Sequence, residues 1–152
     1  MEITEVRIKL VSDLDDRLRA FCSVTFDGEF VVRDLKIIEG LRGHFVAMPS
    51  RKLMDKCSRC TGKNDVKARY CSNCGARLAD GKPGRSDAAT GKPRMFADIA
   101  HPINAACRER IEAAVLAAFD EERELATKPG YVCRYDDYDD PARSLTLPTE
   151  HP

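Results

Sequence analysis

Four of the seven cysteines form two close pairs in the middle of the chain. Two residues separate Cys57 from Cys60 and Cys71 from Cys74, and ten residues lie between the pairs. A two-residue gap lets both thiolates of a pair turn toward one point, so two such pairs can supply a tetrahedron of sulfur ligands. The spacing predicts that these cysteines bind one structural zinc ion per chain, because zinc favours four soft ligands.

Two disulfides or four free thiols are the alternative interpretation of these pairs. An odd total of seven cysteines fits poorly with a closed set of disulfides, and clustered cysteines in a reducing cytosol are more often metal ligands. Gly75 follows the second pair, where a residue that tolerates positive φ is commonly needed. A segment of about 20 residues buries too little surface to fold alone, so we expect it to be unfolded without metal.

Catalysis by this metal is not expected, because four protein ligands leave no position open for water. A zinc hydrolase or deaminase would also need a glutamate general base, as in a His-x-Glu sequence. No His-x-Glu occurs in the chain. His101 has no serine, cysteine or aspartate partner placed for catalysis and is expected to be structural. We therefore predict a protein that is not an enzyme.

The charge is unevenly distributed although the net charge is zero. Residues 1–54 hold nine basic and nine acidic side chains, residues 55–94 hold ten and four, and residues 95–152 hold six and twelve. The chain thus has a basic middle and an acidic end, which is more informative than the sum. The basic middle favours an anionic partner, although part of its charge could neutralise the thiolates.

Alternation of apolar and polar residues predicts four strands in the first third of the chain. In the second of them Ala20, Cys22, Val24 and Phe26 fall on one face, and Asp27-Gly28 after it is typical of a hairpin turn. Sequential strands with short connections predict an antiparallel meander. The predicted strands span residues 3–11, 18–27, 30–38 and 44–48.

A helix is predicted over residues 104–126. Pro102 and Asn104 are typical of helix starts, and Lys128-Pro129-Gly130 should end it. One helix face is apolar and the other carries Arg and Glu. No apolar run reaches the roughly 20 residues that span a bilayer, and no signal peptide precedes the first strand, so we expect a cytoplasmic protein. The apolar stripe consists of Cys107, Ile111, Ala114, Val115, Ala118 and Phe119.

Composition predicts three further segments. Residues 55–78 form the zinc ribbon, with Asn64-Asp65 as a turn between two short strands. Residues 79–94 are turn formers with nothing to pack, which is typical of a flexible linker. Residues 127–152 include four closely spaced aspartates and predict an acidic, disordered tail. Such a tail could also bind a cation, or mimic nucleic acid and occupy the basic surface.

When residues 55–94 are left out, the flanking pieces MEITEVRIKLV, FVVRDLKIIEG, GHFVAMPSRKL and FADIAHPIN, with the helix RERIEAAVLAAF, resemble the SpoVG family (stage V sporulation protein G). The resemblance implies a discontinuous α+β domain of residues 1–54 plus 95–126. Its small antiparallel β-sheet with a C-terminal helix would be interrupted by the inserted zinc ribbon. The resemblance also implies a homodimer formed through sheet strands, and a regulator that binds DNA and in some cases RNA.

The resemblance places Arg51 and Lys52 in the family's most recognisable segment, where we expect them to neutralise phosphates. Solvated loop charges are the alternative. Arg33 and Lys36 should lie on opposite faces of their strand by its period of two, so at most one shares a surface with Arg51. The candidate nucleic-acid-binding residues are Arg33, Lys36, Arg51, Lys52, Lys67 and Arg69.

These observations together predict a cytoplasmic, homodimeric regulator that binds nucleic acid, with DNA favoured over RNA. We expect no membrane partner and no small-molecule substrate. The alternative is a zinc-ribbon adaptor that binds proteins without contacting nucleic acid directly. Basic side chains packed around the thiolates would favour the adaptor, whereas an outer face shared with Arg51 and Lys52 would favour nucleic acid.

Overall fold

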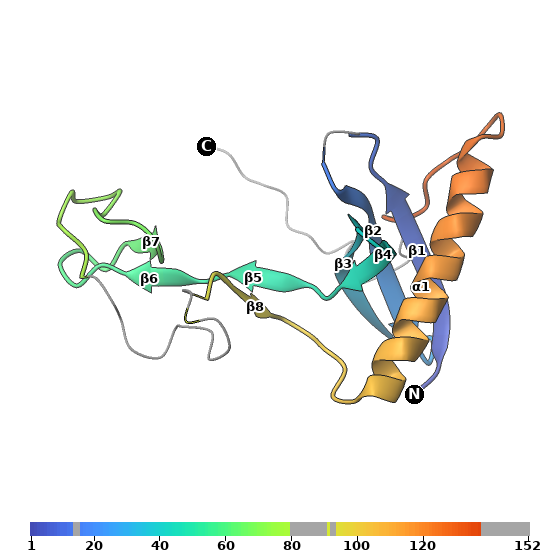
Figure 1. The fold of residues 1–152 in the computed structure, drawn as a ribbon, viewed down its shortest axis with the longest axis horizontal. Helices are drawn as coiled ribbons and strands as arrows, with labels where there is room; N and C mark the ends of the chain where they lie inside the picture. Colours follow the sequence, from blue (N-terminus) through green and yellow to red (C-terminus); the bar gives the residue numbers. More distant parts are fainter. Residues whose placement is uncertain (14–15, 80–90, 92–93, 138–152) are drawn as a thin grey trace, which may run out of the picture. The chain divides into compact units, whose positions relative to one another are not determined.

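The computed structural model describes residues 1–13, 16–79, 91 and 94–137. They form two compact units, which we call the sheet unit (Met1–Ala47 and the described residues from Pro102 on) and the cysteine unit (Met48–His101). Figure 1 labels their elements. These are β1 (Ile3–Leu10), β2 (Leu18–Phe26), β3 (Phe30–Gly40), β4 (Gly43–Ala47), β5 (Ser50–Lys52), β6 (Met54–Lys56), β7 (Lys63–Asp65), β8 (Phe96–Asp98) and α1 (Ala105–Ala126).

The sheet unit is built on a four-stranded antiparallel sheet in the order β1-β2-β3-β4 (Figure 1). Strands that are neighbours in sequence are neighbours in space, so the predicted meander is confirmed. Asp27 (φ 53°) and Gly28 (φ 64°) form the turn between β2 and β3 in left-handed backbone, as their types allow. The fold is therefore an antiparallel sheet with one C-terminal helix, as the sequence predicts.

A β-bulge interrupts the ladder between β2 and β3. The register shifts between Cys22 and Val24, so that two residues of β3, Arg33 and Asp34, oppose the single residue Ser23. Asp34 has a φ of 63°, the left-handed conformation that one residue of such a bulge often adopts. An extra residue at this point reverses the alternation of side chains in the rest of β3.

The bulge places Arg33 and Lys36 on the same face of the sheet. Without it, their separation of three positions would put them on opposite faces. The prediction of opposite faces is therefore wrong, because a period of two holds only along an uninterrupted strand. Leu35 and Ile37, which flank Lys36, are 2% and 0% exposed on the other face.

Helix α1 covers one face of the sheet, which we call the inner face; the opposite one is the outer face. Asn104 caps the helix by accepting a hydrogen bond from the Cys107 N–H at 2.8 Å, which confirms the predicted start. The Phe119 ring meets His44 of β4 edge-on, with centroids 5.2 Å apart. In the described part of the chain no helix is long and apolar enough to cross a membrane. The buried core includes Ile8, Ala20, Cys22, Val24, Phe26, Leu35, Ile37, Val46, Ile111, Val115 and Phe119.

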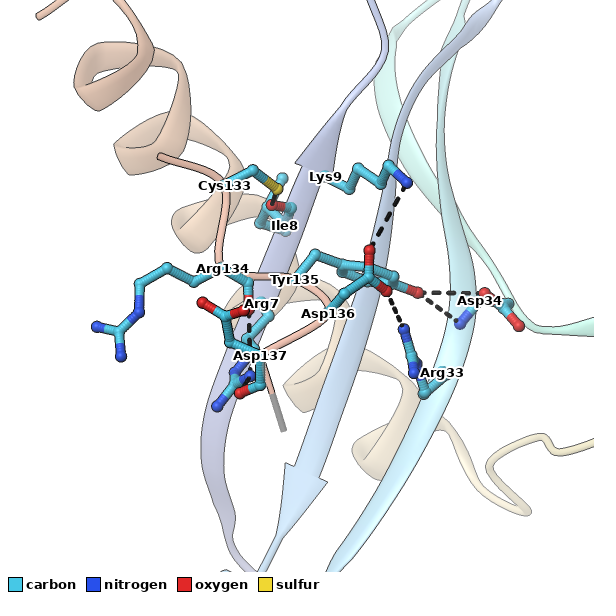
Figure 2. Close-up of polar contacts among 10 residues, drawn as sticks. All are labelled: Arg7, Ile8, Lys9, Arg33, Asp34, Cys133, Arg134, Tyr135, Asp136 and Asp137. Carbon is cyan, nitrogen blue, oxygen red and sulfur yellow. Dashed lines mark hydrogen bonds and ion pairs between the residues drawn. The ribbon is translucent and has the colours of Figure 1, made fainter. Parts of the chain in front are cut away.

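After α1 the chain turns at Gly130 (φ 79°) and returns to the outer face of the sheet. We call residues 131–137 the returning segment (Figure 2). Its Cys133 thiol donates to the Ile8 carbonyl at 3.7 Å, and its Tyr135 is 4% exposed. The prediction of a disordered tail over residues 127–152 is thus corrected for the part up to Asp137. Residues 138–152 lie outside the described residues.

The cysteine unit consists of two short antiparallel ladders, β5 with β8 and β6 with β7. Only Leu53 separates β5 from β6, so one continuous stretch of chain runs from the first ladder into the second. The unit is wider than the predicted ribbon of residues 55–78, because β5 and β8 belong to it. The predicted turn at Asn64-Asp65 is wrong, since both residues lie within β7 and pair with β6. Of the predicted linker 79–94, residues 80–90 and 92–93 lie outside the described residues.

Candidate metal centre and basic surfaces

The two cysteine pairs fold as two turns with the same backbone hydrogen bonds. In each, the first cysteine's N–H donates to the carbonyl five residues later, and its carbonyl accepts from the N–H four residues later. Both thiols of each pair therefore turn toward one side. The bonds are Cys57 to Gly62 (2.8 Å), Thr61 to Cys57 (2.9 Å), Cys71 to Ala76 (2.8 Å) and Gly75 to Cys71 (3.0 Å).

The residue after each pair has left-handed backbone. Gly75 has a φ of 76°, which confirms the expected positive φ there, and Thr61 has a φ of 62° at the matching place. For a residue with a Cβ this conformation costs about 1–2 kcal/mol. The Thr61 hydroxyl donates to the Cys60 carbonyl at 2.6 Å, which contributes to holding the turn.

The four sulfur atoms converge on one point, all within 4.8 Å of one another. The distance is 3.8 Å between the Sγ atoms of Cys57 and Cys74, and 3.5 Å between those of Cys60 and Cys71. Four sulfurs about 2.3 Å from a central ion form a tetrahedron with edges of about 3.8 Å. Cysteines far apart in the chain are thus already at the spacing of a four-sulfur metal site.

N–H groups near the sulfur atoms of Cys60 and Cys71 favour the ionised form of these two thiols. The hydrogen bond from the Ala76 N–H lowers the pKa of Cys74, but burial and the neighbouring thiols outweigh it and raise this pKa to about 11. A hydrogen bond from the Cys74 backbone, followed by bonds from Asn64 and Asn73, lowers the pKa of Cys71 to about 6. The Asn73 side chain, then the Gly62 N–H, lowers the pKa of Cys60. Metal ions bind thiolates and not thiols, so these donors prepare the ligands for an ion.

Asn64 is a supporting residue that sequence reasoning missed. It is 3% exposed, and its amide nitrogen donates to Cys71 Sγ at 3.4 Å. Its amide oxygen accepts from the Ser72 N–H at 2.9 Å, so one side chain joins strand β7 to the second cysteine pair. An Asn seven residues before a cysteine carries no recognised spacing signal, because the contact depends on how β7 folds back.

Replacing Asn64 by Ala is expected to weaken metal binding by about 10–100-fold, the usual effect of losing a residue that orients a ligand. Asn73→Ala provides a matched comparison, because Asn73 is exposed and its side-chain amide donates to Cys60 Sγ at 3.4 Å. Competition with chelators of graded affinity measures the metal affinity of both variants. Equal affinities for Asn64→Ala and the wild type would show that Asn64 does not support the site.

The cysteine unit contains four of the predicted nucleic-acid residues. The Lys52 ammonium forms an ion pair with the Asp65 carboxylate at 2.6 Å, and Lys52 is the main reason that the pKa of Asp65 is lowered. Arg51, Lys67 and Arg69 are exposed, and none of them forms an ion pair with another described residue. Lys52 is therefore held within the unit, whereas the other three are available to a partner.

The outer face of the sheet unit carries Arg33 and Lys36, the other two residues predicted to bind nucleic acid. Two further cations on this face, Arg7 and Lys9 of β1, were not predicted as binding residues. Arg7 and Lys9 alternate with the buried Ile8 and the half-buried Val6 and Leu10 of β1, and this alternation was the signal that could have identified them. We call Arg7, Lys9, Arg33 and Lys36 the basic face. Phe21 of β2 pairs with both Lys9 and Lys36, so a half-buried aromatic ring lies in the row between two lysines.

Comparison with known proteins relates this chain to one family. The model of the SpoVG family matches residues 1–121. SpoVG of Finegoldia magna is 40% identical over 124 residues, covering 82% of this chain and 79% of that protein. SpoVG of Clostridium acetobutylicum is 38% identical over 121 residues (80% and 86%), and SpoVG 1 of Listeria monocytogenes 37% over 126 residues (83% and 85%). The names of all three relatives refer to septation.

Proposed function

The chain belongs to the SpoVG family, and from this premise we propose that it is a regulatory protein that binds nucleic acid through the basic face of its sheet. The row of Lys9, Phe21 and Lys36, with Arg33 nearby on the same face, carries the proposal. Cations of this kind neutralise phosphates, and an aromatic ring on a sheet can stack on an unpaired base. Neighbouring strands lie about 4.8 Å apart, so these groups can contact one stretch of backbone.

We further propose that the four cysteines hold one structural zinc ion. The thiolate donors, their tetrahedral spacing and the N–H groups around them fit such an ion. With four protein ligands, the ion supplies stability to the cysteine unit and leaves no position for a substrate. In this proposal residues 55–78 of the cysteine unit are an insertion into the SpoVG domain, and the cysteine unit carries Arg51, Lys67 and Arg69 as a second group of cations.

A homodimer formed through sheet strands is part of the same proposal. Among the described residues, β4 pairs with β3 and with no other strand, so its outer edge is unpaired. Phe45 on β4 is 42% exposed. An open strand edge beside an exposed aromatic residue is suited to pairing with a second copy.

A protein-interaction adaptor is the second candidate. It would be favoured if basic side chains packed around the thiolates. The thiolates instead accept hydrogen bonds from the backbone N–H groups of Arg59, Gly62 and Asn73 and from the side chains of Asn64 and Asn73. Exposed cations on both units support nucleic acid as the partner, and we take that as the better-supported function.

Affinity measured over a salt series tests this function with labelled single-stranded DNA, duplex DNA and RNA of one length. We expect micromolar binding at low salt that weakens steeply as salt rises. Lys36→Gln should reduce the slope of log affinity against log salt by about one, the effect of losing one phosphate contact. Arg110→Gln is the matched control, because it removes one exposed positive charge from α1, which covers the inner face.

Two results would contradict the proposal. If Lys36→Gln and Arg110→Gln change the slope equally, the basic face does not contact phosphates. If the metal-loaded protein binds none of the three nucleic acids at low salt, nucleic-acid binding is excluded and the adaptor becomes the better explanation.

A further inference from the structure

The returning segment lies against the same outer face to which we assign nucleic acid. Tyr135 anchors it: the tyrosine hydroxyl accepts from the Asp34 N–H and donates to the Asp34 carboxylate, each at 3.2 Å. The Arg33 guanidinium lies 4.9 Å from the centre of the Tyr135 ring. Figure 2 shows this ring crossing the sheet toward the bulge in β3. The returning segment therefore has a defined position on the sheet.

The acidic group of this segment is bound by cations of the basic face. One carboxylate oxygen of Asp136 lies 2.7 Å from the Arg33 guanidinium, and the other lies 3.9 Å from the Lys9 ammonium. Asp136 thus bridges a cation of β1 and a cation of β3 (Figure 2). A carboxylate between two cations occupies the place that a phosphate of nucleic acid would take.

Arg7 holds the backbone of the same segment. Its guanidinium donates to the Arg134 carbonyl at 3.1 Å and also to the Asp137 carbonyl. Three of the four residues of the basic face therefore contact residues 134–137. Lys36 is the exception: it is exposed and makes no ion pair within the described part of the chain.

The contacts of Asp136 are weak enough to be exchanged. The Asp136 side chain is 66% exposed, and its partners Lys9 and Arg33 are 53% and 24% exposed. Ion pairs with an exposed carboxylate contribute little individually. Nucleic acid presents several phosphates at once and gains from the release of counterions. A polyanion can therefore displace the carboxylate, while the free protein keeps it in place.

We propose that the returning segment is a built-in competitor of nucleic acid, with Asp136 occupying the phosphate site formed by Lys9 and Arg33. The inference rests on the proposed nucleic-acid binding and adds its regulation. Binding requires the segment to leave the basic face, so the apparent affinity equals the intrinsic affinity multiplied by the fraction of molecules in which the face is open.

Asp136→Asn tests this in the full, metal-loaded chain, with labelled single-stranded DNA as the probe. Loss of the ion pairs should open the face and tighten binding by about one-and-a-half- to fivefold, the range that an exposed ion pair accounts for. Asp137→Asn is the matched control. It removes the same charge from the neighbouring residue, whose carboxylate pairs with no described residue, so it should change affinity clearly less.

A double-mutant cycle separates competition from simple charge removal. Arg33→Gln should weaken binding less in the wild-type background than in the Asp136→Asn background, because in the wild type the loss of Arg33 also releases Asp136. Hydrogen exchange of the backbone at residues 133–137 supplies a readout that does not depend on affinity. It should accelerate when DNA is added to the wild type.

The outcomes distinguish this inference from the function on which it rests. If the wild type binds DNA, but Asp136→Asn and Asp137→Asn bind equally and exchange at residues 133–137 does not change, the competitor is excluded and nucleic-acid binding stands. If none of the variants binds DNA at low salt, both proposals fail together.

Discussion

Removal of the metal is expected to unfold the cysteine unit and to leave the sheet unit folded. The buried cluster around the site consists of Cys57, Cys71 and Leu78, so two of its three members are themselves proposed ligands. Such a cluster contains too little apolar surface to replace the metal. Structural zinc in small modules contributes about 10 kcal/mol or more, and we expect the double substitution Cys60→Ser and Cys71→Ser to remove that stabilisation.

Hydrogen exchange and limited proteolysis measure this effect, with metal content determined by elemental analysis. Residues 54–78 should lose protection in the double variant, while β1–β4 and α1 should keep it. Cys107→Ser is the control, because it removes a half-buried thiol from the sheet unit and should retain one zinc per chain. A metal-free protein in which residues 54–78 remain protected would refute the structural role of the metal.

Truncation of Phe119 to Ala is expected to lower the free energy of unfolding of the sheet unit by about 3–5 kcal/mol. Phe119 is 2% exposed, and its ring fills the space between α1 and His44 of β4. Its loss leaves a cavity in a small core that contains no tryptophan. Since small domains are stable by only about 5–15 kcal/mol, the unit becomes marginal.

Urea denaturation followed by circular dichroism measures this change in the metal-loaded chain. Ile103→Ala is the control, because Ile103 is 91% exposed just before α1 and its truncation should cost less than about 1 kcal/mol. The variant should still bind its metal, since the cysteine unit has its own ligands and ladders. A loss below about 1 kcal/mol for Phe119→Ala would mean that the helix does not seal the core.

The strands and the helix could be predicted because each depends on a local pattern. Alternating apolar residues located β1 to β4 to within a few residues, and Asn104 located the start of α1. The four cysteines could be grouped because a two-residue gap has a direct geometric meaning for a metal ion. Their convergence to within 4.8 Å agrees with that prediction.

The role of Asn64 and the shared face of Arg33 and Lys36 depend on contacts between residues far apart in the chain, and no local sequence pattern predicts them. Asn64 supports the second cysteine pair only because β7 pairs with β6 and brings it there. Arg33 and Lys36 share a face only because β3 contains a bulge opposite Ser23, and the bulge depends on how two strands align.

The amino-acid sequence by itself determined the grouping of the four cysteines, the order of the elements and the SpoVG family, because these follow from residue types at short spacings. Only the tertiary structure decided what surrounds the four cysteines and what covers the basic face. The sulfur atoms of Cys57, Cys60 and Cys71 accept hydrogen bonds from N–H groups. Tyr135 brings Asp136 between Lys9 and Arg33. Arg33 and Asp136 are 103 positions apart in the chain, so they meet only because the returning segment packs on the sheet.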